Sequence, residues 1–322
     1  MSASGSIAPT LGVSVPDYAL VSIDRGCINR GNLIIQRATQ HVLALSDSTF
    51  EINAYSRIGA KTLKKLNVSK ALILPGATLL EPGDHLAMKD LSAVKIPILA
   101  VGVCLRSELD LVDLSVAQNI KLPIGSRDPF THRALRAHGL ESHLVGCQTL
   151  FLGRASGWLE RDGPILFCPG LGDGRVQNEC LRACAVVGPT IVLSHAPDVE
   201  CFEFDNSNPK VVPLAGAEQA ISLISSASVV VTCRIHALLL CLAFGTPAVF
   251  LGGWYDSRYS LLELLGVSVE PPIPRRIQRI LERVRSGKCP PEYCFQVADN
   301  LRASMREFLD RVAQPLGLHP NV

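Results

Sequence analysis

Short apolar runs alternate along the chain with segments whose apolar residues recur at helical spacing. A run of four to eight apolar residues is typical of a buried strand, and an amphipathic segment is typical of a helix that covers a sheet. The strand-like runs are YALVSI, ALILPGA, IPILAVGV, SHLVGCQTLFL, PILFCPG, VGPTIVLSHA, SVVVT and PAVFLGG. Their order predicts strand–helix alternation in both halves of the chain.

Helix signals stand between several of these runs. The segment GNLIIQRATQHVLAL predicts a helix that begins near Asn32. In SRDPFTHRALRAHGL, Asp128 suits the N-cap, Pro129 suits the first helical position, and Gly139 suits the C-terminal stop. A last amphipathic helix is predicted near the C-terminus, where apolar residues follow helical spacing. These apolar residues are Val297, Leu301, Met305, Leu309 and Val312.

The alternation predicts an α/β protein with two doubly wound, Rossmann-like domains that face a cleft. With 322 residues, the chain is long enough for two domains of ordinary size. The polar, Gly-containing segment GRASGWLERDG suits the boundary, which gives domains of residues 1–155 and 156–322. The C-terminal packing helix is assigned to the second domain. Polar residues that directly follow strands are the first candidates for a site, because ligands of such sheets bind there.

Composition excludes several classes of protein. Hydrophobic residues make up 48% of the chain, the mean hydropathy is +0.26 and the net charge is +2. This composition favours large buried cores over disorder, and the small charge argues against a nucleic-acid binder. No apolar run approaches the ~20 residues of a membrane span, so membrane contact would be peripheral. The N-terminus lacks the features of a secretory signal, and a cytoplasmic location is expected.

The eleven cysteines are scattered through apolar contexts, which favours reduced, buried thiols over a disulfide framework. The segments CLRAC and CPPEYC lack the CxxC pairs of common zinc sites, and no matching pair of histidines accompanies them. No metal is expected. The loop GLGDG lacks the Lys-Ser/Thr of a phosphate-binding P-loop and is interpreted as a loop of the cleft.

The most apolar part of the chain, VVVTCRIHALLLCLAFGTPAVFLGG, contains two strongly polar residues, Arg234 and His236. The strand is expected to end near Thr232 and the helix to begin near Ile235. Free N–H groups at a helix start attract anions, and an arginine adds two donors suited to phosphate or carboxylate. The alternative is structural: an arginine paired with a carboxylate and a core histidine with its hydrogen bonds satisfied.

This segment resembles the signature of the polysaccharide pyruvyl transferase family, in which a strand is followed by Arg-x-His and a helix that ends in Gly-x-Pro. NRGNLIIQRAT resembles the family's N-terminal Asn-x-Gly block, and LILPGATL resembles its first glycine loop. SRDPFTHRALRAHGLESHLVGCQTLFL resembles its Arg-Asp block. The similar segments are in order and span residues 20 to 265.

The resemblance implies a GT-B-like fold and transfer of the pyruvyl group of phosphoenolpyruvate onto sugar hydroxyls as a ketal, without a metal or organic cofactor. It implies that Arg234 and the backbone at Ile235 bind the donor and that His236 is the catalytic acid. Arg127 matches the arginine of the Arg-Asp block, which in the family contacts the donor, so the resemblance makes it a second catalytic candidate; the structural alternative is a charge beside the N-cap of the next helix. Arg258 stands where the family often has lysine and keeps the charge but not its geometry, so donor binding and a solvated helix arginine are equal alternatives. Cys233 is interpreted as a small core residue rather than a proton donor.

Five residues that follow predicted strands are candidates for the cleft, and the resemblance implies that the loop with Asn29, Gly31 and Asn32 lines its acceptor side. The five residues are Asn29, Gly31, Asn32, Gly76 and His195. Structural interpretations stand beside the functional one: a capped helix with a tight turn for the first three, a loop glycine for Gly76, and a capped loop for His195. The acceptor would be a saccharide, lipid- or nucleotide-linked, and a homo-oligomer is left open.

Two other functions fit parts of the sequence. A GT-B glycosyltransferase that uses a nucleotide sugar needs a carboxylate for the ribose, for which Asp256 and Glu263 are candidates. A catalytically silent scaffold of polysaccharide assembly is the third hypothesis, and the intact Arg-x-His argues against it.

Overall fold

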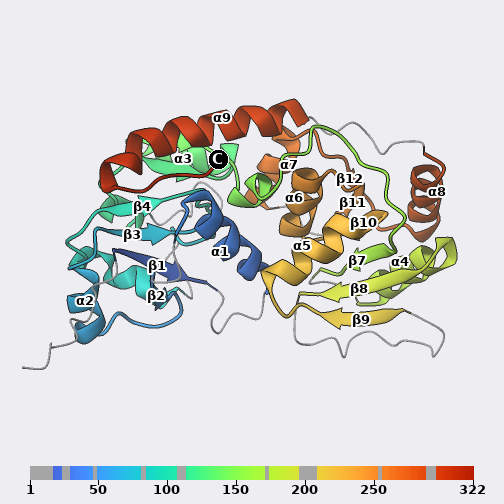
Figure 1. Ribbon diagram of the computed structural model, residues 1–322, viewed down its shortest axis with the longest axis horizontal. Helices are drawn as coiled ribbons and strands as arrows, with labels where there is room; N and C mark the ends of the chain where they lie inside the picture. The colour runs from blue at the N-terminus through green and yellow to red at the C-terminus, as the bar shows by residue number, and fades with distance from the viewer. Residues whose placement is uncertain are drawn as a thin grey trace, which may run out of the picture.

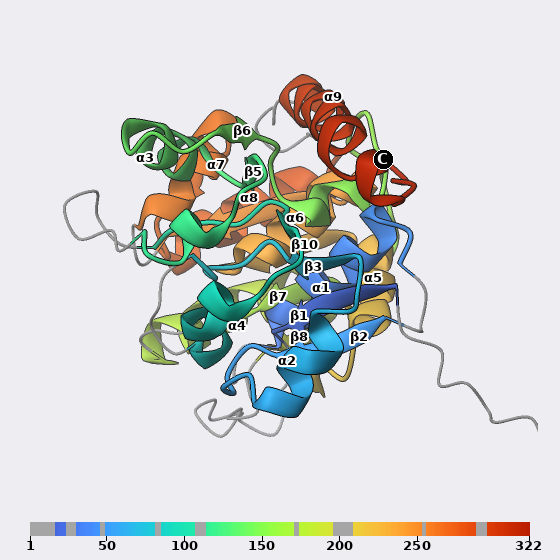
Figure 2. The ribbon, with the colours of Figure 1, turned by 90° about the vertical axis from the view of Figure 1, so that its left-hand side faces the viewer.

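The computed structural model describes residues 17–23, 30–45, 49–80, 85–106, 114–170, 174–195, 209–252, 256–287 and 295–322. Its two halves each contain a parallel sheet, and they lie side by side along the long axis of the molecule (Figure 1). Seen along that axis, the elements of the two halves overlap one another (Figure 2). None of the helices in the described ranges is both long and apolar enough to cross a bilayer.

The sheet of the second half has six described strands in the order β12-β11-β10-β7-β8-β9, all paired in parallel. They are β7 (Ile165–Cys168), β8 (Thr190–Ser194), β9 (Lys210–Pro213), β10 (Val229–Thr232), β11 (Ala248–Leu251) and β12 (Val269–Glu270). This order is the doubly wound order 3-2-1-4-5-6 of dinucleotide-binding domains. Its direction reverses between β7 and β10, which is where such sheets bind ligands.

The sheet of the first half has the order β2-β1-β3-β4 among the described residues. The strands are β1 (Tyr18–Ser22), β2 (Phe50–Asn53), β3 (Ala71–Leu74) and β4 (Ile98–Ala100). Two further parallel strands, β5 (Ile124–Ser126) and β6 (Ser142–Leu144), pair with each other. A bridge between Val103 and Ser126 connects this pair to the chain that leaves β4, so both sets of strands direct their carboxyl ends toward the same region.

Alternating residues of the second sheet face two different helix layers, as expected of a sheet covered on both sides. In β7, Ile165 and Phe167 pack toward α4 (Gly174–Val187) and α8 (Pro274–Arg285), whereas Leu166 and Cys168 face the opposite layer. That layer contains α5 (Ala217–Ser226) and α6 (Ile235–Phe244). The remaining second-half elements, η6 (Ser257–Tyr259) and α7 (Ser260–Leu264), follow β11.

The apolar core is continuous between the two halves. One cluster joins Leu20, Ile73 and Leu99 of the first sheet to Leu166 and Val230 of the second, through α1 (Gly31–Val42), α5, α6 and the short 3-10 helix η4 (Gln148–Phe151). A second cluster fills the outer face of the first sheet, with α2 (Ala60–Leu66), η1 (Leu86–Ala93) and α3 (Pro129–Ala137) around it. The halves therefore share an interior rather than meeting across a polar surface.

The C-terminal helix α9 (Phe295–Val312) lies along the first half (Figure 1). Its Leu301, Met305, Leu309 and Val312 are buried, as the helical spacing predicts. Ser304 Oγ donates to the carbonyl of Leu144 at the end of β6. The sequence division placed this helix in the second domain, and the boundary near residue 155 stays a prediction. In the structure, however, α9 contacts β6 and η4, so the C-terminal helix packs against the first half of the protein.

Most predicted strands form, but they are shorter than the apolar runs that predict them. The largest difference is in SHLVGCQTLFL, which forms β6 over Ser142–Leu144 only and then the 3-10 helix η4. Gly146 has φ +77°, a left-handed conformation that ends the extended backbone there. The caps of α3 are as predicted, because Asp128 accepts a hydrogen bond from Thr131 N and Pro129 is the first helical residue.

Candidate active site

The start of α6 lies at the reversal point of the second sheet, directly after β10. Thr232 Oγ1 accepts a hydrogen bond from Arg234 N at 2.8 Å, which fixes the turn between strand and helix. Arg234 is the N-cap residue, and no side chain caps the first turn. Its side chain is fixed by a hydrogen bond, because Nε donates to Pro169 O at 2.8 Å in the loop after β7. The helix start thus keeps its unbonded N–H groups beside a fixed guanidinium.

Arg258 enters the same region from η6, after β11. Its Nε donates to both carboxylate oxygens of Asp256, at 2.8 and 3.0 Å, and Nη2 also contacts Oδ2. Asp256 additionally accepts from Arg258 N at 2.9 Å. Burial alone would lower the pKa of Arg258, but the hydrogen bonds that it donates to the Asp256 carboxylate raise it. The guanidinium is therefore a permanent charge in a set position.

Arg127 reaches the site from the first half, directly after β5. Its side chain is almost completely buried, with 2% of the residue exposed. Two of its donors, Nε and Nη2, have no hydrogen-bond partner, and the nearest carboxylate, Asp128, lies 3.8 Å from Nε. Asp128 is already engaged by Thr131 as the N-cap of α3. A buried guanidinium with unpaired donors is costly, and these donors make Arg127 a candidate for binding an anion.

His236, in the first turn of α6, lies among these cations. Its pKa is well below the usual value, first because of burial and then because of Arg127, Arg258, His195 and Arg234, in that order. Without a ligand the imidazole is therefore neutral at physiological pH. Cys147 Sγ, beyond β6, lies 3.9 Å from Nδ1 and 3.5 Å from Thr149 Oγ1. These contacts hold the ring from its Nδ1 side.

His195 follows β8 and is 1% exposed, with neither ring nitrogen hydrogen-bonded. Burial and the charge of Arg234 lower its pKa to about 3, so this ring is also neutral. Its backbone carbonyl accepts a hydrogen bond from Arg30 N at 2.8 Å, just before α1. His195 thus lies at the contact between the second half and the helix that begins the acceptor side in the sequence-based interpretation.

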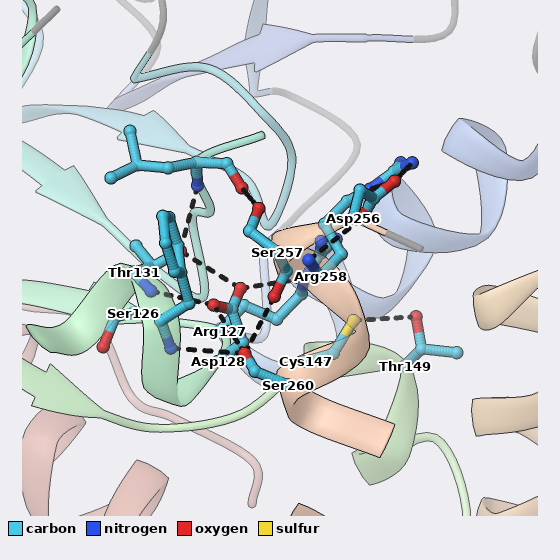
Figure 3. A network of polar contacts seen from close by, with 12 residues as sticks. Ser126, Arg127, Asp128, Thr131, Cys147, Thr149, Asp256, Ser257, Arg258 and Ser260 are labelled. Atoms are coloured by element: carbon cyan, nitrogen blue, oxygen red, sulfur yellow. Dashed lines mark hydrogen bonds and ion pairs between the residues drawn. The ribbon is translucent and has the colours of Figure 1, made fainter. Parts of the chain in front are cut away.

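The two halves are joined on both sides of this cluster. Ser257 Oγ donates to Leu105 O at 2.9 Å, which ties η6 to the segment after β4. Ser260 Oγ donates to Asp128 Oδ1 at 3.3 Å, which ties α7 to the N-cap of α3 (Figure 3). On the other side, Arg30 Nη1 donates to Leu214 O at 2.7 Å. Arg127 and Arg258, which come from different halves, are therefore held in one network.

The structure brings together Arg127, Arg234, His236 and Arg258, and it places Ile235 N in the first turn beside them. Asn29 lies outside the described residues. Asn32 Nδ2 donates to Ile23 O at 3.1 Å, and Gly31 is the first residue of α1.

Gly76 is buried beneath Gln148: a Cβ there would come within 2.1 Å of Gln148 Oε1 and 2.9 Å of Gly102 O. The absence of a side chain is explained by this packing. Cys233 packs with the core cluster of α4 and α8, on the side of the strand end away from the site.

Sequence reasoning missed Cys147 and the pairing of Arg258 with Asp256. Cys147 follows β6 as the other candidates follow their strands, so strand-end position was a usable signal for it. Asp256 and Arg258 are only two residues apart, and nothing in the sequence distinguishes this pair from solvated charges. Among the described residues, no group of three or more His, Cys, Asp or Glu side chains could hold a metal ion.

A family model described as polysaccharide pyruvyl transferase matches residues 29–255. No curated protein sequence matches the chain. Among solved structures, UDP-GlcNAc 2-epimerase of Methanocaldococcus jannaschii is similar with a TM-score of 0.56 and 11% identity, over 91% of this chain and 99% of that one. The Neisseria meningitidis epimerase gives 0.56 and 9%, over 92% and 99%. At such identities the likeness shows the fold alone, which is the two-domain, Rossmann-like GT-B fold.

Proposed function

The chain belongs to the polysaccharide pyruvyl transferase family, and we propose that it transfers the pyruvyl group of phosphoenolpyruvate onto two hydroxyls of a saccharide as a ketal. The family makes it a transferase that modifies polysaccharide. The donor, the acceptor and the residue roles are the proposal. The acceptor is a saccharide, lipid- or nucleotide-linked, and no metal or organic cofactor takes part.

The cluster of three arginines from both halves is the observation that carries the proposal. Phosphoenolpyruvate has a phosphate and a carboxylate, and each needs cationic, multiply donating partners. Arg127 offers two buried donors that lack partners, and Arg258 and Arg234 are fixed by Asp256 and Pro169. The N–H groups at Ile235 and His236 add the partial positive charge of the α6 start. A donor with two anionic groups matches this arrangement.

His236 is the acid in this proposal, and it needs a proton that it lacks in the empty site. Three of the four groups that lower its pKa after burial are arginines. A donor with several negative charges neutralises them, so donor binding raises the pKa of His236 and the ring takes up a proton. The donor thereby prepares the acid that acts on it.

The reaction balances without a redox partner. One sugar hydroxyl adds to C2 of the donor while C3 gains a proton and becomes a methyl group. Phosphate then leaves with the C2–O bond electrons, and the second hydroxyl attacks the resulting oxocarbenium carbon. The two hydroxyl protons replace the one delivered to C3 and accompany the phosphate. His236 supplies the first proton or assists the departure of phosphate.

The nucleotide-sugar alternative offered Asp256 and Glu263 as candidates for binding a ribose. In the structure the carboxylate of Asp256 is engaged by Arg258, so a ribose would have to compete with this ion pair. Seven cysteines in the described ranges are free thiols, which fits the reducing cytoplasm that the proposal assumes.

Direct donor binding tests the proposal without knowledge of the acceptor. Calorimetric titration with phosphoenolpyruvate is expected to show saturable binding, whereas UDP-GlcNAc is not. With cell-envelope saccharides added, phosphate is released and the saccharide gains the mass of pyruvate less water. Saturable binding of the nucleotide sugar with no response to phosphoenolpyruvate contradicts the proposal.

Two variants separate binding from chemistry. His236→Ala is expected to abolish transfer. The variant should keep the melting temperature of the wild type and should still bind the donor. Arg234→Ala mainly weakens donor binding, by about 2–5 kcal/mol for a desolvated charge contact. Full activity in both variants places the site elsewhere. Arg133→Ala is a matched control, because this arginine is exposed on α3.

A further inference from the structure

Helix α8 forms the outer end of the second half, on the side away from the first sheet (Figure 1). Its Ile277 and Leu281 are completely buried against α4 and the second sheet. The opposite side of the helix is exposed. The packing thus fixes which residues α8 presents outward.

The charge of this helix is unlike that of the rest of the chain. Five arginines and one glutamate give α8 a formal charge of +4, whereas the whole chain carries +2, so all other residues together carry −2. Arg276 is paired with Glu270 at 2.6 Å, and Arg285 donates to Val187 O. The remaining three arginines, Arg275, Arg279 and Arg283, are exposed.

These three arginines recur every four residues, so they form one stripe along the exposed side of α8. Like charges at this spacing destabilise a helix. No hydrogen bond or ion pair to another described residue offsets the repulsion. The nearest acidic residue on the helix, Glu282, accepts a hydrogen bond from Gln278 instead. An anionic partner would remove this repulsion.

Exposed apolar side chains flank the stripe. Ile273, which caps the start of α8, is 51% exposed. Val186 is 72% exposed near the end of α4, beside the point where Arg285 contacts Val187. The exposed Arg182 lies one helical turn before Val186. Cations with apolar side chains at both ends match a lipid surface, in which charges bind headgroups and apolar groups enter the acyl boundary.

We propose that this surface, formed by Arg275, Arg279, Arg283, Ile273 and Val186, docks the protein on an anionic lipid bilayer. A nucleic acid would use the arginines but not the exposed Ile273 and Val186. The attraction is electrostatic at first and is therefore screened by salt. Docking is peripheral and reversible, because the surface is the outer side of a folded domain. The proposal does not depend on the donor or on catalysis.

Flotation of the full chain with lipid vesicles tests this surface. The protein is expected to float with vesicles that contain phosphatidylglycerol, to stay unbound with phosphatidylcholine alone, and to be released by high salt. Replacing Arg275, Arg279 and Arg283 together by Gln should lower the partition coefficient about 100-fold, since each arginine near an anionic surface contributes ~1 kcal/mol. Helix stability should not fall, because like-charge repulsion is removed.

A charge-matched control replaces Lys61, Arg133 and Arg136, all exposed on the first half, by Gln and should float like the wild type. The pair Val186→Ser and Ile273→Ser should reduce vesicle binding and leave binding to heparin unchanged. The proposal is overturned if the wild type does not bind anionic vesicles, if the arginine variant and the control behave alike, or if the serine pair binds vesicles like the wild type. Phosphoenolpyruvate titration of the same variants keeps this result separate from the proposed function.

Discussion

At the scale of single residues, the buried ring of His195 lowers the stability of the folded protein, and no hydrogen bond to another described residue offsets this loss. Both ring nitrogens are buried without a partner, and each such group disfavours the folded state by about 1–3 kcal/mol. A side chain of this kind is usual at functional sites, where stability is given up for a ligand contact.

His195→Leu is therefore expected to stabilise the ligand-free protein by about 1–2 kcal/mol, because an apolar side chain of similar size loses no hydrogen bonds. Denaturant unfolding at pH 8 measures the change. Ser126→Ala is the matched control: this buried hydroxyl donates to His143 O at 2.9 Å, so its removal should destabilise the protein. If His195→Leu is as destabilising as Ser126→Ala, the ring has a partner in solution.

The same histidine predicts how stability depends on pH. The pKa of His195 is about 3 in the folded protein and about 6.5 in the unfolded chain, so the unfolded state binds more protons between these values. Stability is therefore complete above pH ~6.5 and is lost as the pH falls, by about 1.4 kcal/mol per unit for this ring. His236 acts in the same direction.

Unfolding free energies of wild type and His195→Leu between pH 7 and pH 5 check this expectation. Over this range the variant should lose about 2 kcal/mol less in total than the wild type. Equal slopes would mean that His195 titrates normally in the folded protein.

The candidate site was predictable from the sequence only where position along the chain identifies a residue. Arg234 and His236 follow an unmistakable apolar strand, and strand ends of doubly wound sheets bind ligands. The unpaired donors of Arg127 were not predictable, because they depend on how the segment after β5 packs against the start of α7, 132 residues later. The pairing of Arg258 with Asp256 depends equally on side-chain direction, which no spacing encodes.

At the scale of elements, α6 is anchored at both ends, and its C-terminal end faces the segment that joins the halves. Gly245 ends the helix with φ +69°, and a Cβ there would come within 2.4 Å of Gly157 O. Leu159 N donates to Gly245 O at 2.7 Å. The position of Arg234 and His236 at the other end thus depends on this contact.

Gly245→Ala should destabilise the protein by more than Gly139→Ala. Both glycines have positive φ, which costs alanine about 1 kcal/mol, but the space around Gly139 is open. Only Gly245→Ala adds a clash with backbone. Thermal unfolding of both variants measures the difference, and equal destabilisation would show that the linking segment yields to the added methyl group.

Element prediction succeeded where caps and periodicity agreed, as in α3. It failed at SHLVGCQTLFL, since an apolar run does not reveal that Gly146 turns the backbone out of the strand. The two-residue strand β12 is too short for any periodic signal, and pairing with β11 defines it.

At the scale of the whole molecule, the shared core makes the two sheets one cooperative unit. Relative motion of domains is the default expectation only where the interface is small or polar. Here Leu99 of the first sheet and Phe250 of the second belong to one buried cluster. Closure around a ligand is therefore expected to involve loops more than rotation of the halves.

Calorimetry should show a single unfolding transition. Leu99→Ala and Phe250→Ala, each of which costs about 2–5 kcal/mol, should shift this one transition as a whole. Two separate transitions, with each variant moving only one of them, would contradict a shared core.

The periodicity of the sequence predicts the helix and sheet layers of this molecule. It does not predict that α9 packs against the first half. The apolar stripe of α9 shows that one side is buried, and it carries no information about which surface covers it. Phe308 of α9 lies against Gly125, where an added Cβ would come within 3.0 Å of its ring. This close approach joins residues almost two hundred positions apart.

The return of α9 has a consequence for synthesis on the ribosome. The strands β5 and β6 emerge early, but the helix that covers them begins about 150 residues later along the chain. At ~5–20 residues per second, the wait between Leu144 and Phe308 is roughly 8–33 s. During that time the apolar surface around Gly125 and Val145 is open to other nascent chains. The first half of this protein can therefore complete its fold only after α9 has left the ribosome.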